Sequence, residues 1–137
     1  MSQDSNGKYN VNKDNVAIGG YDVVAYFTQN AALRGTQKHE AQYNGVKYWF
    51  TSEANKQQFE ADPEKYLPQY GGWCAFAMGM KGGKAPSDPN TFKLYNGKLY
   101  LFFNDYYQGA PFNTIVPWNG DEANLKQKAD ANWANLK

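Results

Sequence analysis

Cysteine is nearly absent from the sequence, and this scarcity excludes a disulfide scaffold. Cys74 has no second cysteine to pair with, so the cysteine count leaves the redox compartment undetermined. Long apolar runs are lacking as well. The longest candidate, residues 99–103 (LYLFF), is far shorter than the roughly 18 residues of a membrane helix and suits a strand. No membrane span is therefore predicted.

An excess of one charge is also missing. The chain has 14 basic and 13 acidic residues, and neither sign forms a long block. Binding to nucleic acid or to an anionic membrane needs clustered positive charge. We therefore expect neither partner, and the sequence leaves the oligomeric state unknown.

Aromatic residues are abundant, at 17% of the 137 residues. A chain of this length suits one domain, which removes roughly two-thirds of its unfolded surface from water. Its core should be built from rings, and the polar atoms of Tyr and Trp then need partners or a wet edge.

The start of the chain differs from the rest. Residues 1–14 are polar with almost nothing to bury, which predicts a flexible tail followed by one domain over residues 15–137. The start has no basic region followed by an apolar stretch, so no secretory leader is recognised. Such a start is expected both for a periplasmic or secreted domain without its leader and for a cytoplasmic protein.

Two Asn-Gly pairs predict two β-hairpins, because both central positions of a tight hairpin turn favour positive φ angles. The predicted strands flank these pairs, at residues 39–43 and 46–50 and at residues 92–95 and 98–104.

Capping residues predict where helices begin. Ser52 suits the cap of a helix that ends by Ala61, and Asp62-Pro63 predicts a second start directly after it. Residues 121–135 have an acidic first turn and apolar residues at helical spacing, which predicts a closing helix.

The remaining segments are less regular. The apolar run VVAYF within residues 16–27 suits either a short strand or a helical turn, and Asp22 is favoured as the cap of a helix that begins at Val23. Residues 105–120 hold two prolines and two glycines and are expected to form a long connection. The fold class predicted is α+β, a small single domain with two hairpins, a strand-to-helix unit and a C-terminal helix.

A set of motifs runs through most of the chain: GYDVVAYF (20–27), YWF (48–50), a Phe-to-Tyr segment (59–66), PQYGGWCA (68–75), DP (88–89), GKLYL (97–101) and KADANW (128–133). Together they resemble the YHS-domain family in its longer bacterial form, with Val23 where relatives have Pro. The resemblance covers about residues 16–135. It implies a small α+β domain around a hairpin-plus-helix unit, which in many relatives is exported.

Short metal-binding members of this family carry cysteines near their start and at the strand-to-helix corner. The matching positions in this chain are Ala25, Thr51 and Asn55. A methyl, a hydroxyl and an amide supply no thiolate, which is the donor that such sites use. The resemblance therefore implies that a metal site of this kind is empty here.

A different soft-metal site is predicted around the only thiol. Cys74 and Met78 share one helical face, Met80 adds a second thioether if the chain unwinds at Gly79, and His39 adds an imidazole. This donor set suits copper as Cu(I). The alternative is that Cys and Met fill the core, as they commonly do, and that His39 is an exposed histidine at a strand end.

Aromatic side chains offer a second class of function. One set can line a groove for a small ligand or pack into the core with wet polar tips: Tyr21, Tyr26, Tyr70 and Trp73. A second set lies on the long connection and is the better candidate for exposed contact: Tyr106, Tyr107 and Trp118.

A thiol-dependent enzyme is a third hypothesis. It would pair Cys74 with His39 and use the Gly71 and Gly72 amides as oxyanion donors, but nothing in the sequence supports that distance. The leading prediction is a non-enzymatic binding domain that handles copper through Cys74. The alternative is a module that binds a small molecule or a protein on an aromatic surface, with Cys74 purely structural.

Overall fold

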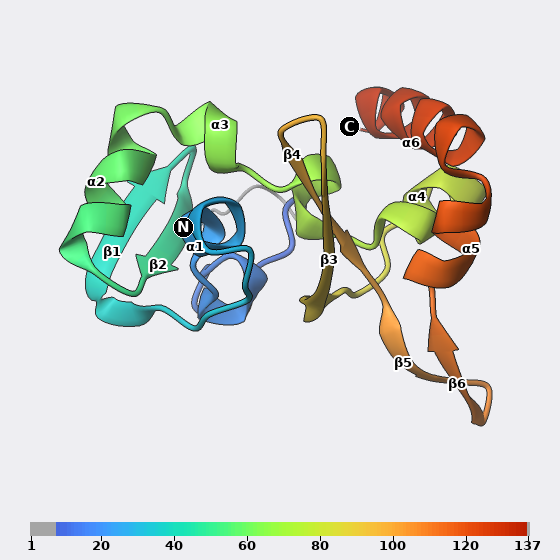
Figure 1. The fold of residues 1–137 in the computed structure, drawn as a ribbon, viewed down its shortest axis with the longest axis horizontal. Helices are drawn as coiled ribbons and strands as arrows, with labels where there is room; N and C mark the ends of the chain where they lie inside the picture. Colours follow the sequence, from blue (N-terminus) through green and yellow to red (C-terminus); the bar gives the residue numbers. More distant parts are fainter. Residues whose placement is uncertain (1–7, 137) are drawn as a thin grey trace.

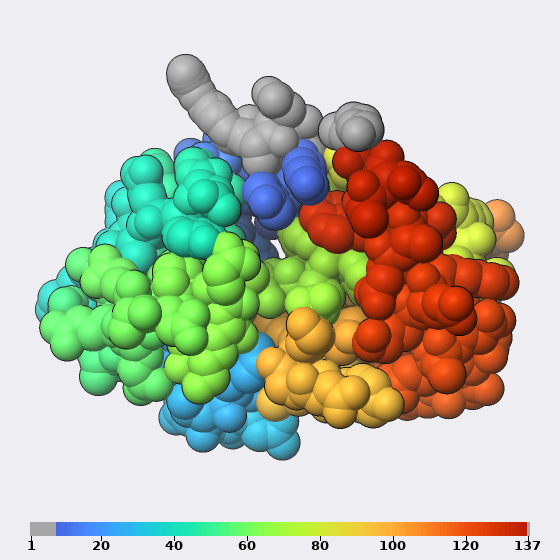
Figure 2. Space-filling view, turned by 90° about the horizontal axis from the view of Figure 1, so that it is seen from above, coloured from blue at the N-terminus to red at the C-terminus, as the bar shows by residue number. Residues whose placement is uncertain are grey.

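A computed structural model describes residues 8–136, and it confirms the α+β class predicted from the sequence. The elements form two groups that lie side by side in Figure 1, each with its own cluster of buried apolar side chains. Seen from above in Figure 2, the first group (cyan and green) lies beside the second (orange to red). No helix within residues 8–136 is long and apolar enough to cross a membrane.

The first group holds the N-terminal hairpin and the helices that cover it. Its elements in chain order are η1 (Ile18–Gly20), α1 (Val23–Thr28), β1 (Thr36–Tyr43), β2 (Val46–Phe50), α2 (Glu53–Ala61) and α3 (Pro63–Tyr66). Phe59 of α2 packs its ring 5.2 Å from that of Phe50 and 4.7 Å from that of Tyr48, centroid to centroid. These ring contacts fix α2 on the inner face of the hairpin.

The second group follows. Its elements are η2 (Gln69–Gly72), α4 (Ala75–Lys81), β3 (Asp88–Tyr95), β4 (Lys98–Phe102), β5 (Asn104–Tyr107), β6 (Ala110–Asn113), α5 (Ile115–Gly120) and α6 (Glu122–Asn135). The buried indole of Trp118 lies 5.4 Å from the ring of Phe102 and 5.7 Å from that of Tyr100. The β5–β6 hairpin projects away from the rest of the molecule, as Figure 1 shows.

Strand β4 joins the two groups because its side chains point alternately into one and the other. Successive side chains of a strand point to opposite faces. Accordingly, Leu99 and Leu101 belong to the first apolar cluster, whereas Tyr100 and Phe102 belong to the second. One strand therefore contributes to both cores, which explains why β4 is almost entirely buried.

Both Asn-Gly hairpins are confirmed. Asn44 and Gly45 have φ angles of 52° and 80°, and β1 pairs with β2 in antiparallel fashion around them. Asn96 and Gly97 have φ angles of 52° and 74° between β3 and β4. Each turn needs two positive φ angles, which Asn and Gly adopt at low cost.

The predicted caps are largely confirmed. The Ser52 hydroxyl accepts a hydrogen bond from the Asn55 amide at 3.2 Å at the start of α2, and VVAYF forms helix α1, not a strand. Helix α3 begins at Pro63 as predicted, but the Asp62 side chain makes no capping hydrogen bond. Because Pro63 at the first helical position has no N–H group, this helix start has one amide fewer that needs a capping acceptor.

Residues 105–120 do not form the long connection that the sequence predicts. They form most of the β5–β6 hairpin and helix α5. The hairpin turns at Gln108 and Gly109, with φ angles of 53° and 84°. Gln rarely adopts this left-handed conformation, and the turn lacks the Asn-Gly pair of the other two hairpins. The sequence therefore gave no signal for this hairpin.

The N-terminal segment spans both groups. The Asn10 amide donates to the Gly71 carbonyl at 2.8 Å, and the Trp73 indole donates to the Lys8 carbonyl at 2.7 Å. Of the tail predicted for residues 1–14, residues 1–7 lie outside the described residues, whereas residues 8–11 are partly buried against the domain and residues 12–14 are exposed.

Candidate functional site

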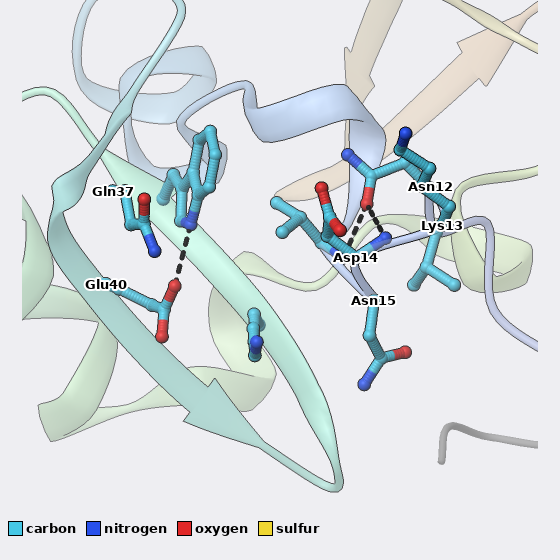
Figure 3. A pocket seen from close by; sticks show the side chains of 10 residues that line it. Asn12, Lys13, Asp14, Asn15, Gln37 and Glu40 are labelled. Carbon is cyan, nitrogen blue, oxygen red and sulfur yellow. Dashed lines mark hydrogen bonds between the residues drawn. The ribbon is translucent and has the colours of Figure 1, made fainter. Parts of the chain in front are cut away.

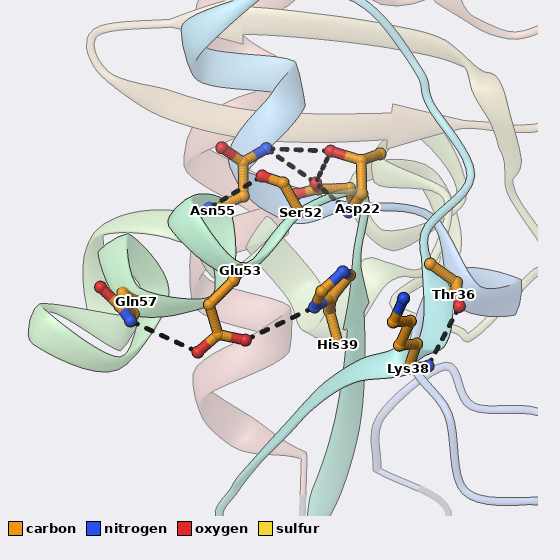
Figure 4. Close-up of polar contacts among 9 residues, drawn as sticks. Asp22, Thr36, Lys38, His39, Ser52, Glu53, Asn55 and Gln57 are labelled. Carbon is orange, nitrogen blue, oxygen red and sulfur yellow. Dashed lines mark hydrogen bonds and ion pairs between the residues drawn. The ribbon is translucent and has the colours of Figure 1, made fainter.

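The strand-to-helix corner is held by a buried carboxylate, as Figure 4 shows. Asp22 is fully buried at the start of α1. Its Oδ1 accepts hydrogen bonds from the Val24 amide at 2.8 Å and the Ala25 amide at 3.1 Å. Asp22 is therefore the helix cap that the sequence predicts.

The second oxygen of Asp22 reaches across to the corner between β2 and α2. Its Oδ2 accepts from the Thr51 amide at 2.9 Å, the Thr51 hydroxyl at 3.0 Å and the Asn55 side-chain amide at 2.8 Å. Thr51 and Asn55, the residues at which the sequence resemblance places cysteine ligands, both point their polar groups at Asp22. One carboxylate, a hydroxyl and an amide are hard donors already bonded to one another, so this corner does not suit a soft metal.

His39 lies on β1, in the first group. Its Nδ1 is 3.4 Å from a carboxylate oxygen of Glu53, whose other oxygen accepts a hydrogen bond from Gln57 (Figure 4). The Gln57 hydrogen bond, with smaller contributions from Lys56 and His39, holds the pKa of Glu53 below its usual value. His39 is thus a partly covered histidine at the molecular surface, held by Glu53.

Cys74 lies in the second group, directly before α4, and is fully buried. Its Sγ is 3.3 Å from the hydroxyl oxygen of Thr114, and that hydroxyl donates to the Phe103 carbonyl at 2.8 Å. The single proton of the hydroxyl is used on the carbonyl, so the thiol must be the donor to Thr114. The arrangement places the buried Cys74 sulfur in contact with the Thr114 hydroxyl.

The four predicted copper ligands are only partly brought together. Met78 follows Cys74 by one helical turn and is fully buried, whereas Met80 is 59% exposed. Cys74 and Met80 line one pocket. His39 lies on β1 on the far side of the molecule from α4, so it does not join them (Figure 1). Within residues 8–136, no three His, Cys, Asp or Glu side chains gather closely enough to hold a metal.

An apolar pocket of about 610 Å³ opens between α4 and the β5–β6 hairpin, and we call it the hairpin pocket. Its lining comes from α4, the loop after it and the hairpin: Cys74, Phe76, Ala77, Met80, Lys81, Gly83, Lys84, Ala85, Pro86, Phe103, Tyr106, Tyr107, Phe112 and Thr114. The rings of Phe76 and Phe112 contact each other edge to face in the wall of the pocket, with centroids 6.2 Å apart, and the Tyr107 ring lies 6.0 Å from that of Phe112.

Exposed apolar side chains concentrate at this pocket. Among residues 8–136, five large apolar side chains are exposed, and Met80, Tyr106 and Tyr107 of these five line the hairpin pocket. Tyr106 is 70% and Tyr107 is 47% exposed, as the sequence predicts for these two residues. Trp118, the third residue predicted to be exposed, is fully buried because α5 folds it against β4.

For the other aromatic set, the sequence left a ligand groove and core packing as alternatives, and two of its members pack into the core. Tyr26 and Tyr70 are buried, and their hydroxyls donate to the Pro89 carbonyl and to Asp130. Burial, with the Asp130 carboxylate adding to it, raises the pKa of Tyr70 above its usual range. These rings serve the core, and their polar tips are satisfied there.

Two other cavities are more polar. One, of about 490 Å³, lies between residues 11–16 and the β1–β2 hairpin, and Figure 3 shows its amide and charged side chains around Glu40. Glu40 accepts a hydrogen bond from the Trp49 indole at 2.9 Å. The other, of about 420 Å³, lies between the two groups beside Tyr43 and Trp133. Water hydrogen-bonds well to polar lining groups and so competes with a ligand in these two cavities. Neither cavity offers as much apolar contact as the hairpin pocket.

The architecture is that of a small α+β domain with a carboxylate-held corner and a separate apolar pocket. The family model of the YHS domain matches residues 24–70 of the chain. No curated protein and no solved structure gives a significant match. The matched segment includes Thr51 and Asn55 but ends before Cys74, so the hairpin pocket lies outside it.

The sequence did not point to most residues of the pocket. Phe76, Phe103, Phe112 and Thr114 were not predicted as site residues, although they form its walls. An available signal was the aromatic density of residues 102–112, where five of eleven residues are Phe or Tyr.

Proposed function

We propose that the protein is a non-enzymatic binding module that takes up a small apolar organic molecule in the hairpin pocket. The observation that carries this proposal is the ring-lined wall between α4 and β6, with exposed Tyr107 at its edge. The pocket volume of about 610 Å³ falls within the range of roughly 300–1,000 Å³ that small-molecule sites occupy.

The energetics favour a ligand over water in this pocket. Each Å² of apolar surface removed from water stabilises a complex by about 25 cal/mol, and a water in the pocket finds few hydrogen-bond partners. The Cys74 thiol and the Thr114 hydroxyl, the polar side-chain groups deep in the wall, are already bonded to each other. Ligand contact is therefore mainly with rings and methylenes.

The test is a titration with Nile red, a neutral dye that fluoresces in apolar surroundings. Tyr107→Ser removes one wall of the pocket and should weaken binding by about tenfold, because an aromatic contact of 1 to 2 kcal/mol is lost. Tyr95→Ser is the matched control, since Tyr95 is also an exposed hairpin tyrosine but lies outside the pocket. Equal loss in both variants, or no binding to the parent protein, would reject the proposal.

Copper binding through Cys74 is the second candidate, because Cys74 and Met80 line one pocket and Met78 lies one turn from Cys74. Thiolate and thioether suit Cu(I). We expect Cu(I) affinity, measured by competition with a chromophoric chelator, to fall in Cys74→Ser and to be unchanged in His39→Ala. Unchanged affinity in Cys74→Ser would reject this candidate.

A further inference from the structure

The cavity between the two groups, which we call the central cavity, is lined by aromatic rings and polar side chains and has a volume of about 420 Å³. Its walls come from both groups, which lie side by side (Figure 2): Tyr48 on β2 and Glu64 on α3 belong to the first, and Trp133 on α6 belongs to the second. It shares no lining residue with the hairpin pocket. Small-molecule sites commonly lie where two such units meet, so the central cavity is a second candidate site.

Tyr48 presents an unused hydroxyl to this cavity. The residue is only 5% exposed, and its ring packs 4.7 Å from that of Phe59, so the hydroxyl end is the part that reaches the cavity. Within residues 8–136 this hydroxyl makes no hydrogen bond. Burial raises the pKa of Tyr48 above its usual range, so the hydroxyl keeps its proton at neutral pH. A polar group in this position costs free energy unless water or a ligand bonds to it.

The charges around the central cavity favour a ligand of neither sign. Glu64 and Lys98, one acidic and one basic, line it, and the Glu64 carboxylate already accepts a hydrogen bond from the Tyr43 hydroxyl. The Lys8 ammonium lies 5.1 Å from the centroid of the Trp133 ring, so it would repel a second cation at this ring. A neutral ligand avoids both the repulsion by lysine and the repulsion by glutamate.

The aromatic wall decides what kind of neutral ligand can displace water. Because water bonds well to polar groups, the net gain on binding must come from apolar contact. A Cβ on Gly71 would lie 2.9 Å from Cη2 of the Trp133 indole, so glycine at this position lets the indole lie close against η2 in the cavity wall. A sugar ring offers C–H groups to such an indole and hydroxyls at its rim, where the amides of Asn44 and Gln69 supply donors and acceptors.

We infer that the central cavity binds a neutral saccharide. A pyranose ring lies against Trp133, and its hydroxyls bond to the Tyr48 hydroxyl, the Glu64 carboxylate and the lining amides. Ring contact provides the affinity, and the Tyr48 hydroxyl gains a hydrogen-bond partner that the protein itself does not supply. This site is separate from the hairpin pocket, so either can fail without the other.

The experiment titrates the protein with the methyl β-glycosides of glucose, galactose and mannose at millimolar concentrations. Binding is followed by the NMR resonance of the Trp133 indole N–H, assigned as the one absent from Trp133→Phe. We expect at least one glycoside to shift this resonance in a saturable way. Sorbitol is the matched ligand, because it is rich in hydroxyls but has no ring, and we expect it to bind at least about tenfold more weakly since it lacks the contact with the indole.

Tyr48→Phe removes only the unused hydroxyl. It should weaken glycoside binding about fivefold, the effect of one hydrogen bond, and leave the urea midpoint of unfolding unchanged. Tyr100→Phe is the matched control, because Tyr100 is also a buried tyrosine whose hydroxyl has no partner within residues 8–136, but it does not line the central cavity. Its glycoside affinity should equal that of the parent protein.

Three results would overturn the inference. The first is that none of the three glycosides shifts the Trp133 resonance, or that sorbitol shifts it as strongly as they do. The second is that Tyr48→Phe and Tyr100→Phe bind the glycosides equally well. The third is that tetramethylammonium or acetate, taken as charged probes, binds at this resonance more tightly than every glycoside, because the cavity would then select a charge.

Discussion

The side-chain amide of Asn55 donates a 2.8 Å hydrogen bond to the buried carboxylate of Asp22. This bond joins the first turn of α2 to the cap of α1. Thr51 and Asn55 thus both donate to the same internal carboxylate. These hydrogen bonds hold α1, β2 and α2 together at the corner.

Replacing this carboxylate should destabilise the fold. Asp22→Asn places an amide NH₂ group among donors from Thr51 and Asn55, and it leaves buried groups unsatisfied. Hydrogen bonds to a charged acceptor contribute about 1.5 to 3 kcal/mol each. We expect the free energy of unfolding, measured by urea titration, to fall by about 3 kcal/mol or more. Glu60→Gln, an exposed change on α2, should alter it by less than about 0.5 kcal/mol.

The Cys74 thiol should be unreactive in the folded protein. It is fully buried and donates to Thr114. Thiol modification needs an accessible thiolate, so alkylation by iodoacetamide should proceed at least about a hundredfold more slowly in the native protein than in urea. Equal rates by mass spectrometry in both conditions would show that the sulfur is open to solvent.

Alkaline pH should destabilise the fold through its buried tyrosines. Burial raises the pKa of Tyr100 to about 12, and burial with the Asp130 hydrogen bond raises the pKa of Tyr70 further. These groups ionise more readily in the unfolded chain, where the pKa is 10.0. Their contribution is therefore complete below about pH 10 and is lost as pH rises, at about 1.4 kcal/mol per pH unit for each tyrosine.

Urea titrations between neutral pH and pH values above 10 should show this loss. Tyr70→Phe removes one ionisable group, so its unfolding free energy should fall less steeply with pH than that of the parent protein. The same steepness in both proteins would mean that Tyr70 ionises as easily in the folded state as in the unfolded one.

Gly79 should not tolerate a methyl group. A Cβ on Gly79 would lie 2.8 Å from the Leu125 carbonyl oxygen, where α4 meets α6. Alanine would gain about 1 kcal/mol in helix propensity, but the overlap with backbone should cost about 1 to 3 kcal/mol. We expect Gly79→Ala to lower the melting temperature. Gly120→Ala, at a helical glycine with nothing within 4 Å, should not.

The two Asn-Gly hairpins, the Ser52 and Asp22 caps and the closing helix followed from the sequence. Each depends on atoms a few residues apart: positive φ angles at Asn and Gly, or a side-chain oxygen beside a free amide. The third hairpin did not follow, because Gln108 adopts a left-handed conformation that its side chain does not favour.

For the candidate site too, the sequence predicted some residues correctly and others not. Tyr106 and Tyr107 were predicted to be exposed and are, because β5 lies on the projecting hairpin. Trp118 was predicted to be exposed as well, but α5 packs it against Phe102 in the core. Phe102 is distant from Trp118 along the chain, so the residues around Trp118 do not reveal this contact. The burial of Trp118 could therefore not be inferred from the sequence.

By itself the sequence determined the local turns and caps, the presence of a single thiol, and the ring-rich character of the core. Only the tertiary structure decided that Phe76 contacts Phe112 in the wall of a pocket and that Cys74 and His39 belong to different groups. The physical reason is range: turns and caps depend on dihedral angles and hydrogen bonds between near neighbours, whereas a pocket depends on how distant segments pack against one another.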